Sequence, residues 1–390
     1  MDSAPPAPSC IVDLASRRDA PRRIAVFRAL QLGDMLCAVP ALRAIRNGFP
    51  DAESTLIALP WAASFVRRFA RLLDRFVEFP GFPGLPEREP DLPALPAFLV
   101  AAQAARYDFA IQMHGRGDLT NSIVAALGAR ATAGFCPPGG PCPDPLRFLP
   151  WPESGTEIHR LLALTDFLGL PRAGDRLELP LDADEIAQGE ALLVRHRLVS
   201  RRFVCIHPGA RLYTRRWPTD YFAAVAADVA RRGWRVVLTG SEEEALLTRR
   251  IARELPAGSA VDLAGQTTLG AFGALLRHAR LLIANDTGVS HVAAALRVPS
   301  VVVCCGADPR RFAPLDRTLH EVLHHPVACR PCAHVHCPIG HPCAQKLTPD
   351  RVLACVRTRL ATRASAEPLR FPLPLRPIPG DAPQPPPRAP

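Results

Sequence analysis

Short apolar segments alternate with helix-patterned segments along this chain, and the alternation occurs twice. In the first half, residues 23–28, 53–59 and 107–113 have the length and apolar content of buried strands. Helix-patterned segments follow them; residues 36–45, for example, carry apolar side chains at helical spacing. This order predicts an α/β domain in which helices cover a parallel sheet.

The alternation restarts near residue 202. The predicted strands of this second half are 203–207, 235–239, 260–263, 281–284 and 300–304. The helices predicted between and after them are 219–232, 242–255, 269–278 and 289–296. We therefore predict two Rossmann-like domains that face each other across a cleft.

The composition of successive segments predicts where the domains begin and end. We expect a disordered N-terminal segment over 1–22, a first domain over 23–182 and a second over 183–345. A C-terminal helix is expected over 346–365, near 348–362 at its core, and packing back across the first domain. A proline-rich tail over 366–390 is expected to be disordered.

The chain carries a net charge of +10, and nearly all of its positively charged side chains are arginines. The arginines are scattered and form no dense stripe, so nucleic acid is not favoured as a partner. A GC-rich genome explains this usage, and attraction to phosphates or to an anionic inner membrane is the functional interpretation. No apolar run reaches the roughly 20 residues of a membrane helix, and the N-terminus does not resemble a signal peptide. We expect a cytoplasmic protein, with peripheral membrane contact left open.

One segment of the second half has the pattern of a phosphate site. The strand ending at Asn285 is followed by Asp286, Thr287 and Gly288, after which a helix begins. A polar residue can cap this helix, and the free amides at its positive end suit a phosphate group. A capped helix without a ligand is the alternative interpretation.

Two further loops leave the same sheet edge. The loop after residue 207 offers Gly209, Thr214, Arg215 and Arg216, whose guanidinium groups can grip phosphate oxygens. The loop after residue 239 offers acidic residues that suit ribose hydroxyls or, alternatively, the first turn of a helix. Three loops converging on one edge indicate a nucleotide diphosphate.

In the first half, Asp34 follows the first strand and Gly33 precedes it directly. A carboxylate at the top of the sheet, facing the cleft, can act as a general base. A helix-capping role is the alternative.

Four segments together resemble glycosyltransferase family 9, whose best-known members are the ADP-heptose:lipopolysaccharide heptosyltransferases. The segments are Leu32-Gly33-Asp34 with 39–43, His207-Pro208-Gly209-Ala210, Arg216-Trp217-Pro218, and Asn285-Asp286-Thr287-Gly288 ending in His291. Residues 306–309 are similar to a Gly-Pro-Thr-Asp-Pro segment of that family. The resemblance runs from about residue 23 to 360, and the order of its motifs is more specific than any one of them.

The resemblance implies a GT-B fold and an inverting, metal-independent transfer that requires no cofactor. The implied donor is ADP-heptose, and the acceptor is the lipopolysaccharide core or another lipid-linked or cell-surface glycan. Asp34 matches the proposed catalytic base. The donor-binding positions are Gly33, Gly209, Thr214, Arg215, Arg216, Glu243, Glu244, Asp286, Thr287, Gly288, Val289 and His291. Glu243 or Glu244 would contact ribose, and His291 would lie near the donor or pack between helices.

On the acceptor side, Gln112-Met113-His114-Gly115 is similar to a region of the family that faces the acceptor. His114 and Arg116 are therefore the predicted acceptor contacts.

Four cysteines cluster near the end of the second domain. They are Cys329, Cys332, Cys337 and Cys343, in the loop 329–343, with histidines between them. This density suits a structural zinc ion. Disulfides, which a reducing cytosol disfavours, and reduced thiols are the alternatives.

Two other functions fit the same architecture. A nucleotide-sugar epimerase would need further acid and base residues that we do not find near the sugar. A non-catalytic protein that binds nucleotide sugars would not need Asp34. A dehydrogenase is disfavoured because no Gly-x-Gly-x-x-Gly follows either first strand.

Overall fold

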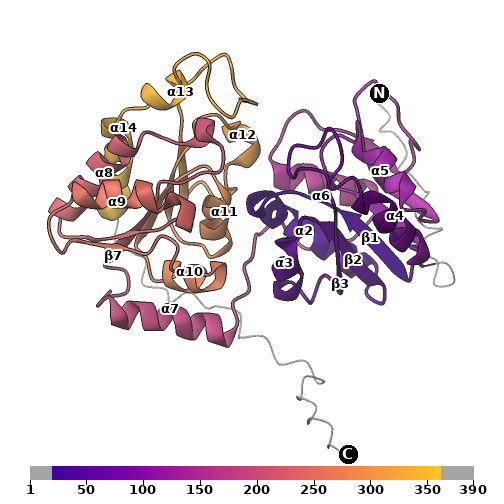
Figure 1. The fold of residues 1–390 in the computed structure, drawn as a ribbon, viewed down its shortest axis with the longest axis horizontal. Coiled ribbons are helices and arrows are strands. Elements are labelled where there is room, and N and C mark those ends of the chain that lie inside the picture. The colour runs from indigo at the N-terminus through magenta and orange to yellow at the C-terminus, as the bar shows by residue number, and fades with distance from the viewer. Residues whose placement is uncertain (1–19, 362–390) are drawn as a thin grey trace, which may run out of the picture.

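The computed structural model describes residues 20–361, which form two α/β domains side by side (Figure 1). The predicted disorder of 1–22 and 366–390 lies outside the described residues, apart from 20–22. The predicted fold class is confirmed, because each domain is built on a parallel six-stranded sheet with helices around it.

The N-terminal sheet is in the order β3, β2, β1, β4, β5, β6, and every neighbouring pair is parallel. Its strands are β1 (Arg23–Phe27), β2 (Glu53–Ala58), β3 (Arg75–Glu78), β4 (Phe109–Gln112), β5 (Ala131–Cys136) and β6 (Phe148–Pro150). The helices are α2 (Leu32–Gly48), α3 (Ala62–Arg68), α4 (Ala94–Ala104), α5 (Thr120–Ala126) and α6 (Glu157–Phe167). The strand order reverses between β1 and β4, so the crevice for a ligand lies beyond the end of β1.

The C-terminal sheet is in the order β12, β11, β10, β7, β8, β9, again parallel throughout. Its strands are β7 (Phe203–His207), β8 (Arg235–Leu238), β9 (Ala260–Asp262), β10 (Leu281–Asn285), β11 (Ser300–Val303) and β12 (His320–Leu323). The helices are α7 (Ala183–Arg195), α8 (Thr219–Arg231), α9 (Ala245–Arg253), α10 (Leu269–Leu276), α11 (Gly288–Ala295), α12 (Pro309–Phe312), α13 (Pro342–Gln345) and α14 (Pro349–Ala361), with 3₁₀ turns at Tyr213–Arg215 and Glu242–Glu244. The order reverses between β7 and β10, the two strands whose following loops are predicted to bind phosphate.

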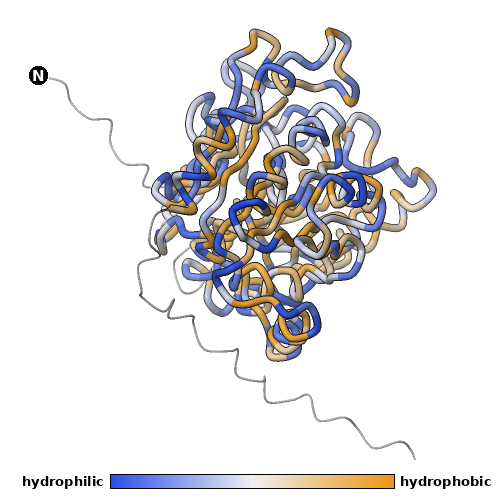
Figure 2. The backbone as a smooth tube through the Cα atoms, turned by 90° about the vertical axis from the view of Figure 1, so that its left-hand side faces the viewer, coloured by the Kyte–Doolittle hydropathy of each residue, from blue (hydrophilic) through white to orange (hydrophobic). Residues whose placement is uncertain are grey.

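Apolar residues explain why the two sheets are central. The inner strands, such as β4 and β10, are buried along their whole length, and hydrophobic segments fill the interior of the molecule (Figure 2). One apolar cluster runs from the N-terminal core through Leu179 and Leu181 of the linker into the C-terminal core. Burial of this surface holds the two domains together.

The C-terminal helix differs from its expected position. α14 contacts α8 and β11, and its buried residues Val352 and Val356 belong to the apolar core of the C-terminal domain. The helix therefore closes its own domain rather than crossing to the first.

Candidate functional site

Asn285, the last residue of β10, organises the loops at the predicted donor site. Its side-chain amide is fully buried and donates to the carbonyl oxygens of Pro208, at 2.7 Å, and Gly209, at 3.3 Å. The side-chain oxygen Oδ1 of Asn285 accepts from the backbone N–H of Trp217 at 3.0 Å. One side chain thus fixes both ends of the loop that carries the predicted phosphate-binding residues.

The turn after Asn285 places Thr287 at the start of α11. Thr287 is extended, at φ −143°, and caps no amide of the helix with its side chain. Its hydroxyl is buried and has no hydrogen-bond partner within residues 20–361. The amides of Gly288 and Val289 at the start of α11 and this hydroxyl are therefore available to a ligand such as phosphate.

Arg215 and Asp286 flank this turn. The guanidinium Nη1 of Arg215 lies 3.9 Å from the carboxylate of Asp286, and its Nε is buried without a partner within the described residues. Burial raises the pKa of Asp286, whereas the neighbouring His291 and Arg215 lower it. Arg215 thus keeps donor groups for a further anion.

Glu244 lies against the loop of Gly209. A Cβ on Gly209 would lie 1.9 Å from the Glu244 carboxylate, so a larger residue there would displace that side chain. That carboxylate accepts from the backbone N–H of Ser241 at 2.9 Å and lies 3.7 Å from Nε2 of His207. Glu243 is exposed, so of the two predicted ribose ligands Glu244 is the one that reaches the loops.

Asp34 lies in the first turn of α2 in the opposite domain and is half-buried. No hydrogen-bond or ion-pair partner of its carboxylate exists within residues 20–361. Its backbone carbonyl accepts two hydrogen bonds from Arg28, at 3.1 and 2.9 Å. Burial raises the pKa of Asp34; Arg28 opposes this rise, and Glu157 adds to it. A free carboxylate with a raised pKa is suited to accept a proton.

A buried ion-pair network lies beneath Asp34. Glu157, at the start of α6, is 1% exposed and pairs with Arg28 at 2.9 Å. Its other oxygen pairs at 2.8 Å with Arg311 of α12, which belongs to the C-terminal domain. Glu157 therefore orders the N-terminal end of α2 and also bridges the two domains.

The N-terminal ends of α2 and α11 meet at the domain interface (Figure 1). A Cβ on Gly33 would lie 2.9 Å from Cδ2 of His291 and 3.3 Å from Cα of Gly288. His291 is buried, and its Nδ1 lies 3.6 Å from the Cys37 thiol. Burial lowers the pKa of His291, which favours a neutral imidazole. Both helix dipoles thus point their positive ends toward the space beside Asp34.

The remaining predicted donor residues have other partners. The buried hydroxyl of Thr214 donates to the carbonyl of His334 at 2.7 Å, which ties its loop to the cysteine-rich segment. Nε of Arg216 donates to the carbonyl of Ala210 at 2.7 Å. Val289 is half-buried in the first turn of α11 and contributes there through its backbone.

The predicted acceptor residues follow β4, and His114 contacts the loop between β1 and α2. His114 is 6% exposed, accepts from the N–H of Ala29 at 3.3 Å and lies 3.6 Å from Glu87. Arg116 is exposed and paired with Asp118. Their assignment to the acceptor stays a prediction.

The four clustered cysteines are free thiols in the described structure. They range from the exposed Cys329 to the buried Cys343. Between residues 20 and 361, no group of three or more histidine, cysteine or acidic side chains is arranged to hold a metal ion. The structure therefore does not support the zinc hypothesis. No described helix is long and apolar enough to cross a membrane.

Sequence reasoning missed two residues of the site, Glu157 and Arg311, and named Asn285 only as part of a motif. Glu157 resembles any acidic residue in the first turn of a helix. Its partners are distant in sequence, so no local signal distinguishes it. Asn285 ends a wholly buried strand, where a polar residue needs partners, and this was the available signal.

Two facing Rossmann-like domains with ligand-directed loops define the class of GT-B proteins. The profile of glycosyltransferase family 9 (heptosyltransferase) matches residues 101–342. The chain therefore belongs to glycosyltransferase family 9, and the expectation of a sugar-transferring enzyme is confirmed at the level of the family.

Individual relatives agree with this assignment. Lipooligosaccharide heptosyltransferase 2 of Campylobacter jejuni is 23% identical over 83% of this chain and 93% of its own length. The corresponding enzyme of Haemophilus ducreyi is 32% identical, but the match spans only 32% of this chain and 38% of that protein.

Solved structures share the fold. A family 9 glycosyltransferase of Veillonella parvula has a TM-score of 0.72 at 18% identity, covering 87% of this chain and 97% of its own. ADP-heptose lipopolysaccharide heptosyltransferase II of Escherichia coli has a TM-score of 0.64 at 20% identity, with coverages of 87% and 98%. An E. coli heptosyltransferase with ADP-2-deoxy-2-fluoro heptose has a TM-score of 0.62 at 18% identity, with coverages of 86% and 99%.

Proposed function

We propose that this protein transfers heptose from ADP-heptose to a hydroxyl of a lipopolysaccharide core or related cell-surface glycan, with inversion at the anomeric carbon. The observation that carries the proposal is the free carboxylate of Asp34 beside the paired N-terminal ends of α2 and α11. The donor and acceptor classes come from the relatives named above, one of which was solved with an ADP-heptose analogue.

In the proposed reaction, Asp34 takes the proton of the acceptor hydroxyl while its oxygen attacks the anomeric carbon. The new carbon–oxygen bond forms on the face opposite the bond to the diphosphate, which breaks. Burial raises the pKa of Asp34 toward neutral pH, and a carboxylate with a higher pKa is a stronger base.

The leaving ADP gains negative charge as that bond breaks. The amides at the start of α11, the unpaired Thr287 hydroxyl and the guanidinium of Arg215 are placed to stabilise this charge. In metal-dependent transferases a metal ion stabilises the charge of the leaving diphosphate. Here these fixed positive groups can do so, and we therefore propose a metal-independent transfer. Glu244 is the proposed contact for the donor ribose.

The Glu157 network has a positioning role in this proposal. Arg28 binds both Glu157 and the backbone of Asp34, and Arg311 ties Glu157 to the donor domain. The network thereby fixes the position of Asp34 relative to the turn at the start of α11 in the other domain.

The experiment for this function has two stages. Thermal shift measurements with ADP, UDP and GDP test the nucleotide, because a ligand that binds only the folded state raises the melting temperature with dose. A transfer assay then follows release of ADP from ADP-heptose, with and without a heptose-deficient lipopolysaccharide acceptor. Acceptor-dependent release supports the proposal, and stabilisation by UDP or GDP but not ADP contradicts the donor.

Peripheral contact with the anionic inner membrane from the cytoplasm is part of the proposal. A lipid-linked acceptor requires it, and the net charge of +10 favours it. Sedimentation with vesicles of phosphatidylglycerol tests it, since salt-sensitive binding is expected.

A further inference from the structure

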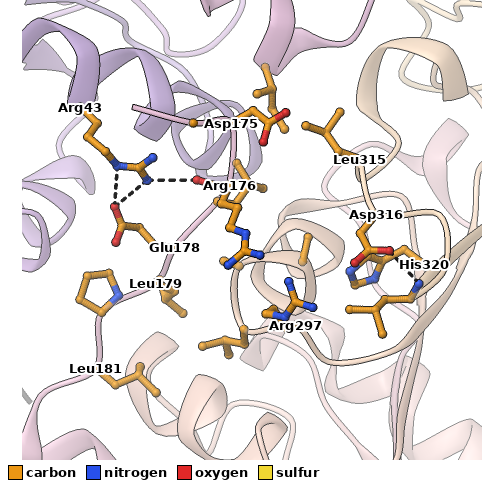
Figure 3. A pocket seen from close by; sticks show the side chains of 18 of the residues that line it. Arg43, Asp175, Arg176, Glu178, Leu179, Leu181, Arg297, Leu315, Asp316 and His320 are labelled. Carbon is orange, nitrogen blue, oxygen red and sulfur yellow. Dashed lines mark hydrogen bonds and ion pairs between the residues drawn. The ribbon is translucent and has the colours of Figure 1, made fainter. Parts of the chain in front are cut away.

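A cavity of about 990 Å³ lies between the domains at the other end of the α2–α11 pair (Figure 3). The N-terminal domain contributes Arg43 of α2, and the linker contributes residues 173–181. The C-terminal domain contributes Arg297, two residues after the end of α11. Asp34 and Gly288, in the first turns of the same two helices, do not line this cavity, so it is separate from the proposed donor site.

Positive charge exceeds negative charge around the cavity. Five arginines line it against three acidic residues, Asp175, Glu178 and Asp316. Glu178 is bound to Arg43 at 2.8 Å, and Asp175 lies 3.5 Å from a histidine. Asp316 accepts hydrogen bonds from the Thr318 backbone and hydroxyl. Each acidic group therefore already has a partner.

Arg176 and Arg297 are lining arginines that do not pair with any of these acidic residues. Within residues 20–361, neither guanidinium group takes part in a hydrogen bond or an ion pair. The two side chains point into the cavity toward each other, one from the linker and one from the C-terminal domain (Figure 3). Two facing like charges repel, and a single anion between them would remove that repulsion. Guanidinium groups match phosphate oxygens in two-bond geometry.

Many of the remaining lining residues are apolar, and they indicate what kind of anion would fit the cavity. Leu177, Leu179, Leu296 and Leu315 face the same space. A large, mostly apolar pocket with a few converging polar groups is typical of sites for small organic molecules. We propose that this cavity binds an organic phosphate, with its phosphate between Arg176 and Arg297 and its apolar part against these leucines.

Isothermal titration calorimetry tests this proposal, with octyl phosphate below its micellar concentration as the probe. The pocket variant is Arg176→Gln with Arg297→Asn; asparagine tolerates the left-handed backbone of residue 297, at φ 55°. The matched control is Arg195→Gln with Arg253→Gln, which removes the same charge from exposed positions on α7 and α9. Circular dichroism melts establish that all three proteins are folded.

Wild type and control are expected to bind octyl phosphate equally, and the Kd of the pocket variant should rise at least about tenfold. Vesicles of phosphatidylglycerol and phosphatidylethanolamine form a second arm. Vesicle binding that is lost only in the pocket variant assigns the phosphate to a lipid headgroup, whereas binding of octyl phosphate alone assigns it to a soluble ester. Equal binding by all three proteins, or binding of neither probe by wild type, overturns the proposal.

Discussion

Replacement of Glu157 by glutamine removes the one negative charge that neutralises both Arg28 and Arg311. Desolvation by burial raises the pKa of this carboxyl, but the charges and hydrogen bonds of Arg28 and Arg311 outweigh it and lower the pKa from 4.5 to about 2. That change corresponds to about 3 kcal/mol of folding free energy at neutral pH. We therefore expect Glu157→Gln to lower the free energy of unfolding by about 3 kcal/mol at pH 7, because Arg28 stays buried without a counter-charge.

The pH dependence of this loss has a defined sign. The pKa of Glu157 is lower in the folded state, so its stabilisation is complete above pH 4.5 and is lost as pH falls toward 2. The difference between wild type and Glu157→Gln should therefore shrink to about 1 kcal/mol at pH 3.

Urea unfolding followed by tryptophan fluorescence at several pH values measures both quantities. Asp220→Asn is the matched control, because its ion pair with Arg250 is mostly exposed and should contribute no more than about 1 kcal/mol. A Glu157→Gln protein as stable as wild type at pH 7, or a loss that is the same at pH 3, would refute the role assigned to this network.

Three further predictions concern the donor side. Arg215→Gln should lower kcat/KM by about 10²-fold, the usual cost of one transition-state contact, in an ADP-release assay; unchanged kinetics would remove Arg215 from the mechanism. Gly209→Ala should weaken ADP binding in calorimetry because its Cβ would overlap the Glu244 carboxylate, and adding Glu244→Ala should not restore affinity if that carboxylate holds ribose. Full recovery in the double variant would instead mean that Glu244 only fills space. EDTA should leave the initial rate of transfer unchanged, and an immediate loss that Mg²⁺ reverses would contradict the metal-independent step.

The sequence predicts most strands inside each sheet, with β5 missed, but of the four edge strands it predicts only β9. β1, β7 and β10 are continuous apolar runs that end in glycine-containing or polar turns. Edge strands β3 and β12 are short and only partly buried, so their sequences lack that signal, and both were missed. Tertiary pairing, rather than local pattern, makes these segments strands.

Four helices were not predicted, the single-turn α12 and α13 and the longer α4 and α7, and the two longer ones were missed for different reasons. α4 lies in a proline-rich stretch that favours a loop, yet Pro96 falls in the first turn, where its missing N–H costs nothing. α7 begins with a capping box of Asp182 and Glu185, a readable start signal, but residues 183–201 were assigned to no element.

The residues of the candidate site likewise fall into those that local sequence motifs predict and those that only the fold brings together. The ordered motifs predicted Asp34, Arg215 and Thr287, because each lies in the loop or first helical turn that comes after a strand. The bridge from Glu157 to Arg311 joins residues 154 positions apart in different domains, and only the folded chain brings them together.

The central claim is that Asp34 removes the acceptor proton while the C-terminal domain holds the donor. Asp34→Asn keeps the size of the side chain and abolishes its basicity, so transfer from ADP-heptose should fall by about 10²–10⁴-fold. The Kd for ADP, measured by calorimetry on the same protein, should stay within about twofold of wild type because the donor contacts remain. Wild-type turnover by Asp34→Asn would contradict this claim and mean that another group removes the acceptor proton.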